Sequence, residues 1–108
     1  MTVPEIDIAE AARRHAAGTP VIDVREPHEY VDGHVPGAPL IPLASVAERL
    51  HEVPADGEVL LICRSGARSG KAAEYLRGQG IEAVNIAGGT MAWIDAGHPV
   101  VTGDEPGS

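Results

Sequence analysis

The chain has 108 residues, the size of one domain with a single hydrophobic core. Its formal net charge of −8 argues against nucleic acid or an anionic membrane surface as a partner. It has one cysteine, which excludes an internal disulfide, and no apolar run approaches the ~18 residues that span a bilayer. The N-terminal residues include acidic side chains and no continuous apolar stretch, so we expect a cytoplasmic protein.

The first predicted elements are short. Residues 2–6 are expected to form an edge strand. Asp7 stands three residues before Glu10, the spacing of a helix N-cap, and we expect a helix from there to about Ala16. The apolar run at 20–24 then predicts a short buried strand.

The following stretch is richer in turns. Pro27 is placed to begin a short helix. Residues 33–39 are dense in glycine and proline and predict a loop, followed by a strand of two or three residues at 40–41. Apolar residues then recur at i, i+3, i+4 and i+7 from Leu43 to Leu50, which predicts a helix.

The second half of the chain has the clearest patterns. An uninterrupted apolar run at 58–62 is typical of a parallel strand that is covered on both faces. Helix spacing begins at Ser69, a further strand is predicted at 82–87, and a glycine pair then turns the chain into a short helix. The polar residues 102–108 are expected to be a disordered tail, so that a single folded domain spans 1–101.

Strands and helices therefore alternate along the chain, and each connection is long enough for a right-handed crossover between parallel strands. This alternation predicts a small α/β sandwich. In such sheets, ligands bind at the carboxyl ends of the strands.

The only cysteine, Cys63, lies at this kind of position, between the predicted strand at 58–62 and a helix. The first N–H groups of a helix lack internal partners and sit at the positive end of its dipole, so a loop that leads into them forms an anion site. A thiol there is shifted toward thiolate, and Arg64 and Arg68 act in the same direction. The alternative, a small buried hydrophobe, would leave two charges unpaired in the interior. The sequence thus predicts a reactive cysteine that faces an anion.

Residues 63–69, Cys-Arg-Ser-Gly-Ala-Arg-Ser, resemble the active-site loop of the rhodanese family of sulfurtransferases. The stretches 21–30 and 33–38 resemble the N-terminal signature of that family, and residues 88–93 resemble its C-terminal one. The matches come in the family's order and at family-like spacing. The resemblance implies a rhodanese-like three-layer sandwich, with a small central parallel sheet and helices on both faces. Because the signatures occur once, it implies the single-domain form.

The resemblance also implies a thiosulfate sulfurtransferase that works through a persulfide on Cys63 without a cofactor. A small anionic donor such as thiosulfate gives its outer sulfur to the cysteine, and cyanide or a thiol removes it. By position in the loop, Cys63 is the nucleophile and Arg64 and Arg68 bind the donor. The rest of the cradle is formed by Ser65, Gly66, Ala67 and Ser69.

Two other functions fit parts of the same pattern. A sulfur-relay or regulatory module would act on a protein partner, for example a protein persulfide donor. A cysteine phosphatase or arsenate reductase on the same fold has one more residue between the cysteine and the arginine, whereas four residues separate Cys63 from Arg68 here. The shorter loop suits a single sulfur atom better than a phosphate or arsenate group. We expect a monomer.

Three further polar residues receive structural interpretations. Asp23 and Arg25 are expected to form an ion pair, and Arg25 with Glu26 or Glu29 to tie down the segment after the strand at 20–24. His34 is expected to form structural hydrogen bonds. The histidines show no metal-ligand spacing, and with one cysteine no metal site is predicted.

Overall fold

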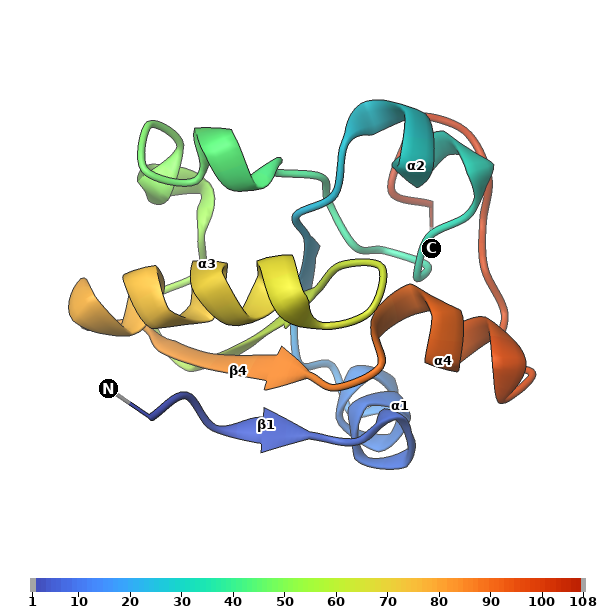
Figure 1. The fold of residues 1–108 in the computed structure, drawn as a ribbon, viewed down its shortest axis with the longest axis horizontal. Coiled ribbons are helices and arrows are strands. Elements are labelled where there is room, and N and C mark those ends of the chain that lie inside the picture. The colour runs from blue at the N-terminus through green and yellow to red at the C-terminus, as the bar shows by residue number, and fades with distance from the viewer. Residues whose placement is uncertain (1, 108) are drawn as a thin grey trace.

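The structure is a computed structural model that describes residues 2–107. Its four strands form one parallel sheet in the order β1-β4-β3-β2 (Figure 1). The strands are β1 (Glu5–Ile6), β2 (Val21–Asp23), β3 (Glu58–Ile62) and β4 (Glu82–Ile86). The predicted strands at 2–6, 20–24, 58–62 and 82–87 are thus confirmed, with β1 at an edge and β3 in the centre.

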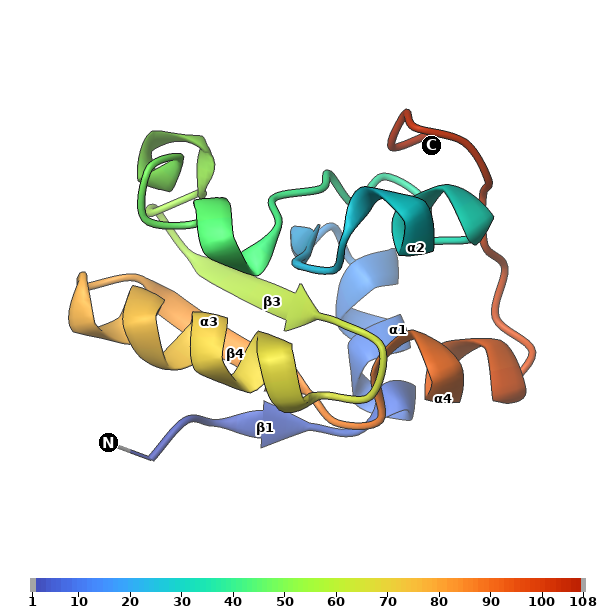
Figure 2. The same ribbon diagram turned by 45° about the horizontal axis from the view of Figure 1, so that its top comes forward.

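Helices cover both faces of this sheet, which confirms the three-layer sandwich. The helices are α1 (Ile8–Ala16), α2 (Pro27–Asp32), α3 (Ala67–Gly78) and α4 (Gly89–Asp95). α3 packs on one face, and α1 and α4 pack on the other and contact each other. α2 and α4 lie at the end of the molecule toward which the β3 arrow points (Figure 2). Within residues 2–107, no helix is long and apolar enough to cross a membrane.

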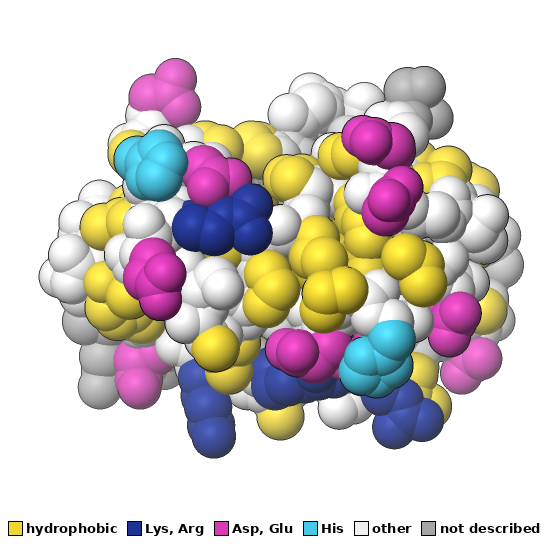
Figure 3. Space-filling model, turned by 90° about the horizontal axis from the view of Figure 1, so that it is seen from above, with side chains coloured by type: hydrophobic (Ala, Val, Ile, Leu, Met, Phe, Trp, Pro, Cys, Tyr) yellow, Lys and Arg dark blue, Asp and Glu magenta, His cyan; other side chains and the backbone are white. Residues whose placement is uncertain are grey.

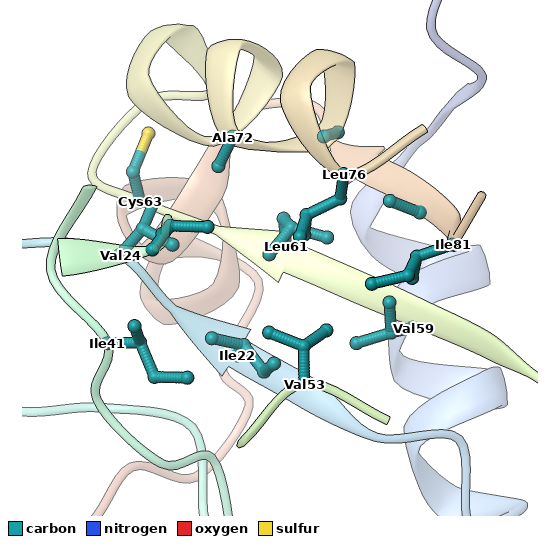
Figure 4. Packing of buried hydrophobic residues seen from close by; sticks show 13 residues of the cluster. Ile22, Val24, Ile41, Val53, Val59, Leu61, Cys63, Ala72, Leu76 and Ile81 are labelled. Atoms are coloured by element: carbon teal, nitrogen blue, oxygen red, sulfur yellow. The ribbon is translucent and has the colours of Figure 1, made fainter. Parts of the chain in front are cut away.

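β3 buries side chains on both faces of the sheet because its apolar run is continuous. Successive side chains of a strand point to opposite faces. Val59 and Leu61 join the cluster beneath α3, and Leu60 and Ile62 join the cluster beneath α1 and α4. Figure 4 shows the first cluster, in which Leu76 of α3 points toward the sheet. Cys63 follows Val59 and Leu61 along the same side of β3 and belongs to this cluster. The core therefore leads directly to the cysteine.

Local signals begin α1 and α2 as expected. The side chain of Asp7 accepts a hydrogen bond from the backbone N–H of Glu10 at 2.9 Å. α2 starts at Pro27, and a capping box between Glu26 and Glu29 closes its first turn. Both caps satisfy N–H groups that have no partner inside the helix.

The helix predicted between Leu43 and Leu50 is wrong. The structure has two short 3₁₀ helices instead, Leu43–Ser45 and Leu50–Glu52. Only Val46 of the predicted apolar stripe is fully buried, so packing gives this short segment little reason to form a continuous helix. The strand predicted at 40–41 is likewise reduced to one bridge between Asp23 and Leu40.

The segment after Val101 contacts the loop that follows α2. Backbone hydrogen bonds join His34 to Val101 in both directions, and the N–H of Gly37 donates to the carbonyl of Pro106 at 2.8 Å. A disordered tail over residues 102–108, and with it a domain limited to 1–101, stays a prediction, and Ser108 lies outside the described residues.

Candidate active site

The loop between β3 and α3 begins at Cys63, at the carboxyl end of a central strand. It ends at Gly66, the N-cap of α3, whose φ of 110° lies in the left-handed region that glycine adopts without strain. The tight turn at Gly66 points the loop's N–H groups inward, toward the cysteine.

The thiol of Cys63 receives hydrogen bonds from both the loop and the helix. The N–H of Gly66 lies 3.1 Å from Sγ, and the hydroxyl of Ser69 lies 3.3 Å from it. Burial raises the pKa of the thiol. Hydrogen bonds from the Ser69 side chain and from the backbone of Ser69, Gly66 and Ser65 lower it by more, so the pKa lies below its ordinary value. The residue is 1% exposed, so this sulfur lies at the bottom of the loop.

Asn85 in β4 forms hydrogen bonds with both Ser69 and Gly66, the residues that donate to the thiol. Its carbonyl oxygen accepts from the Ser69 hydroxyl at 2.6 Å, while its amide donates to the carbonyl of Gly66 at 3.0 Å and to the Glu5 carboxylate at 2.8 Å. A hydroxyl carries one proton, so Ser69 donates either to Asn85 or to the sulfur. Asn85 therefore competes for the proton that stabilises a thiolate. Asn85 was not among the residues predicted for the site, although an amide within the apolar strand at 82–87 was the available signal.

The start of α4 fixes the beginning of the loop. The backbone N–H and the hydroxyl of Thr90 donate to the carbonyl of Cys63 at 2.8 and 3.0 Å, and the N–H of Met91 donates to the carbonyl of Arg64 at 3.1 Å. A Cβ at Gly89 would lie 2.5 Å from the Cys63 carbonyl oxygen, so only glycine permits this approach. The C-terminal signature seen in the sequence thus acts by holding the cysteine peptide in place.

The structure separates the two arginines that the sequence placed together at the donor. Arg68, in the first turn of α3, forms a two-bond ion pair with Glu29 of α2, at 2.7 and 2.8 Å. The hydrogen bonds to Glu29 raise the pKa of Arg68, and the nearby Cys63 anion raises it further. Arg64 is exposed and lines a cavity of about 230 Å³ with side chains of α2 and α4. In the face shown in Figure 3, Lys and Arg side chains gather mostly along one edge, with acidic side chains among them.

The remaining predicted cradle residues divide into two pairs, one at the loop surface and one against the sulfur. Ser65 and Ala67 are exposed, whereas Gly66 and Ser69 face the sulfur. The structure therefore brings Cys63, Gly66 and Ser69 together at the bottom of the loop.

The ion pair predicted between Asp23 and Arg25 is confirmed. Both residues are buried, their closest atoms lie 2.7 Å apart, and Arg25 also donates to the carbonyl of Gly33 at 2.8 Å. Of the two further partners expected for Arg25, Glu26 or Glu29, Glu29 pairs with Arg68 instead. The ring nitrogens of the buried His34 lie 2.9 Å from the carbonyl oxygens of Tyr30 and Glu105, in keeping with hydrogen bonding in the scaffold.

These observations define a class: α/β proteins with a cysteine of lowered pKa among hydrogen-bond donors, in a loop at the carboxyl end of a parallel sheet. The family model for the Rhodanese-like domain matches residues 7–96 of this chain. The chain belongs to the rhodanese-like domain family.

Proteins with similar sequences and structures carry corresponding names. A protein named sulfurtransferase from Allochromatium vinosum is 40% identical over 102 residues, 92% of this chain and 95% of that one. Thiosulfate sulfurtransferase GlpE from Pseudomonas entomophila is 38% identical over 85 residues, 78% of each chain. Among solved structures, a rhodanese-related protein from Thermoplasma volcanium superposes with a TM-score of 0.87 at 33% identity, over 93% of this chain and 99% of that one.

Proposed function

We propose that this protein is a thiosulfate sulfurtransferase that carries sulfur as a persulfide on Cys63. The single observation that carries the proposal is the environment of Sγ, with hydrogen-bond donors at 3.1 and 3.3 Å and a lowered thiol pKa. The attacking species in sulfur transfer is the thiolate, which these donors stabilise. The similarity to a protein named thiosulfate sulfurtransferase supports the same donor.

In the first half-reaction, the thiolate of Cys63 attacks the outer sulfur of thiosulfate. A bond forms between Sγ and that sulfur, the sulfur–sulfur bond of thiosulfate breaks, and its electron pair leaves with sulfite. A thiolate and a dianion thus become a persulfide anion and a sulfite dianion, so charge balances and no proton moves.

In the second half-reaction, cyanide or a thiolate attacks the terminal sulfur of the persulfide. The electron pair of the broken bond returns to Sγ, which regenerates the thiolate, and thiocyanate or a new persulfide leaves. The N–H of Gly66 and the hydroxyl of Ser69, which face Sγ in the free protein, are placed to stabilise the negative charge in both steps.

The proposed roles of the loop residues follow their positions. Cys63 is the nucleophile, Gly66 and Ser69 stabilise the sulfur anion, and Ser65 and Ala67 shape the exposed side of the cradle. Arg64 provides cationic charge for the anionic donor, since guanidinium groups bind oxyanions through paired N–H groups. The guanidinium of Arg68 is engaged by the Glu29 carboxylate. We further propose a monomer in the reducing cytoplasm, where the chain's only cysteine would stay reduced.

The experiment is to incubate purified protein with thiosulfate, measure its intact mass, add cyanide and follow thiocyanate, with Cys63→Ser in parallel. We expect a gain of one sulfur atom that cyanide removes and that the variant lacks. Because Cys63 is the only cysteine, no other thiol in this chain competes for the label.

Absence of both the mass gain and thiocyanate would overturn thiosulfate as donor. The same measurement with a protein persulfide as donor then identifies the sulfur-relay function. Hydrolysis of an aryl phosphate by the wild type, lost in Cys63→Ser, would instead identify a phosphatase.

A further inference from the structure

The ion pair between Glu29 and Arg68 joins two elements that flank the cysteine loop. Each carboxylate oxygen of Glu29 accepts from one terminal nitrogen of the guanidinium, at 2.7 and 2.8 Å. The two residues are 39 positions apart in the chain, one in α2 and the other in the first turn of α3. The pair therefore ties α2 to the helix whose N-terminus faces the thiol.

Glu29 is held in this position from its own helix as well. Its Oε1 accepts a hydrogen bond from the backbone N–H of Glu26 at 3.0 Å, as the capping box of α2 requires. The hydrogen bond from Arg68 lowers the pKa of Glu29 to about 2, although partial burial opposes this. Glu29 is thus a fixed carboxylate at neutral pH.

A fixed carboxylate on Arg68 cancels most of that arginine's charge at the mouth of the loop. Arg25 lines the same cavity as Arg64 and Glu29, and the buried Asp23 cancels its charge in the same way. Arg64 differs, because within residues 2–107 it forms no ion pair and its side chain is exposed. Of these three arginines, only Arg64 has a guanidinium charge left to meet an incoming anion.

We propose that Glu29 is a positioning and specificity residue for sulfur transfer: it holds Arg68 as a brace between α2 and α3 and leaves Arg64 as the cation that receives the anionic donor. This inference rests on the proposed function for the identity of the donor. The effect of Glu29 on the charge that a reagent meets near Cys63 does not depend on which donor the protein uses.

The test compares two alkylating reagents of different charge. Neutral iodoacetamide and anionic iodoacetate both react with the Cys63 thiolate, so the ratio of their rate constants reports the charge near the sulfur. Glu29→Gln leaves Arg68 uncompensated and keeps a side chain that suits the capping box. We expect this variant to raise the ratio of iodoacetate to iodoacetamide reactivity about two- to sixfold at low ionic strength, and less at high salt.

Arg68→Ala has the opposite predicted sign, because it leaves the Glu29 carboxylate uncompensated. We expect it to lower the ratio, and the double variant Glu29→Gln/Arg68→Ala to return to the wild-type value. If Arg68 itself received anions, the double variant would stay as low as Arg68→Ala, which would overturn the proposal. Ratios that do not change in either single variant would also overturn it.

The control is Glu52→Gln, which breaks an equivalent two-bond pair with Arg49 in the 50–52 turn, away from the cysteine loop. Its alkylation ratio should equal that of the wild type. A thermal melt separates folding from charge, since a purely structural role for Glu29 would lower the melting temperature and leave the ratio unchanged. Because the two single variants have opposite predicted signs, either one decides the sign if the other does not fold.

The alkylation ratio requires no sulfur transfer, so failure of the proposed function and failure of this inference are distinguishable. If the wild type takes up sulfur from thiosulfate, the KM for thiosulfate should fall in Glu29→Gln, rise in Arg68→Ala and recover in the double variant. If it takes up none, the ratios still test how Glu29 sets the charge at the loop.

Discussion

The cysteine loop has two regions with opposite chemistry, which we call the floor and the rim. The floor is buried except for the half-buried Gly66, and its groups are thiol, amide, hydroxyl and peptide. It consists of Cys63, Gly66, Ser69, Asn85, Gly89 and Thr90. The rim is more exposed, and its groups are ionic; it consists of Glu29, Arg64 and Arg68.

The difference separates two properties of the site. Short-range hydrogen bonds in the floor act where water is excluded, so they set the pKa of the thiol. Charges at the rim are screened by solvent, so they act mainly on the approach of charged reagents. Changes in the floor should therefore alter thiol reactivity toward every reagent, and changes at the rim should alter the preference between reagents.

The largest expected effect comes from adding a methyl group to the floor at Gly89. Its Cβ would lie 2.5 Å from the Cys63 carbonyl oxygen and 2.6 Å from that of Arg64, so the turn before α4 must move. We expect Gly89→Ala to lower the free energy of unfolding by about 3–4 kcal/mol in urea denaturation. Gly97→Ala is the control, since Gly97 also has a positive φ, 85°, but no atom lies within 4 Å of its Cβ position, and it should cost about 1 kcal/mol. Equal losses would contradict the close contact at Gly89.

A smaller effect should follow from removing one donor of the floor. Ser69→Ala eliminates the hydroxyl 3.3 Å from Sγ, so the thiol pKa should rise. Loss of a hydrogen bond to a charged group, ~1.5 kcal/mol, predicts roughly tenfold slower alkylation by iodoacetamide at neutral pH. At a pH well above both thiol pKa values, the variant and the wild type should react at similar rates. Identical pH profiles would contradict a role for this hydroxyl.

Removing the charge of Arg64, the exposed cation of the rim, should affect the reaction with thiosulfate and not the reaction with iodoacetamide. Arg64→Ala is expected to raise the KM for thiosulfate about tenfold, as loss of one charge-assisted contact implies. Its rate with neutral iodoacetamide should stay at the wild-type value, because Arg64 donates no hydrogen bond to Sγ. Slower reaction with both reagents would place Arg64 in the floor and break the comparison.

The smallest expected effect is the pH dependence of stability from the rim pair. The folded-state pKa of Glu29, about 2, lies below its ordinary value of 4.5, so the pair stabilises the fold fully above pH 4.5 and loses this contribution as pH falls toward 2. With Arg68 35% exposed, we expect about 1 kcal/mol. Urea denaturation over this pH window should therefore show a flatter profile for Glu29→Gln than for the wild type. Parallel profiles would contradict the contribution of the pair.

Some of this arrangement was readable in the sequence because its signals are local. The apolar run at 58–62, the cap at Asp7 and the helix spacing after Ser69 each depend on residues a few positions apart, and the structure confirms all three. The position of Cys63 is local too, since it requires only a strand that ends where a helix begins. Local spacing was not sufficient at 43–50. The apolar residues there have helix spacing, but the segment forms two 3₁₀ helices because tertiary packing buries few of these side chains.

The sequence by itself determined the alternation of strands and helices, the α/β class and the cysteine loop, because turns, caps and apolar periodicity act within one element. Only the tertiary structure decided which charges meet. The order β1-β4-β3-β2 places Asn85 behind Ser69, and the position of α2 at the end of the sheet places Glu29 on Arg68. Residues of these pairs are 16 and 39 positions apart, and no short-range pattern encodes their contact. The cysteine of the floor was therefore visible in the sequence, whereas the charge balance of the rim required the fold.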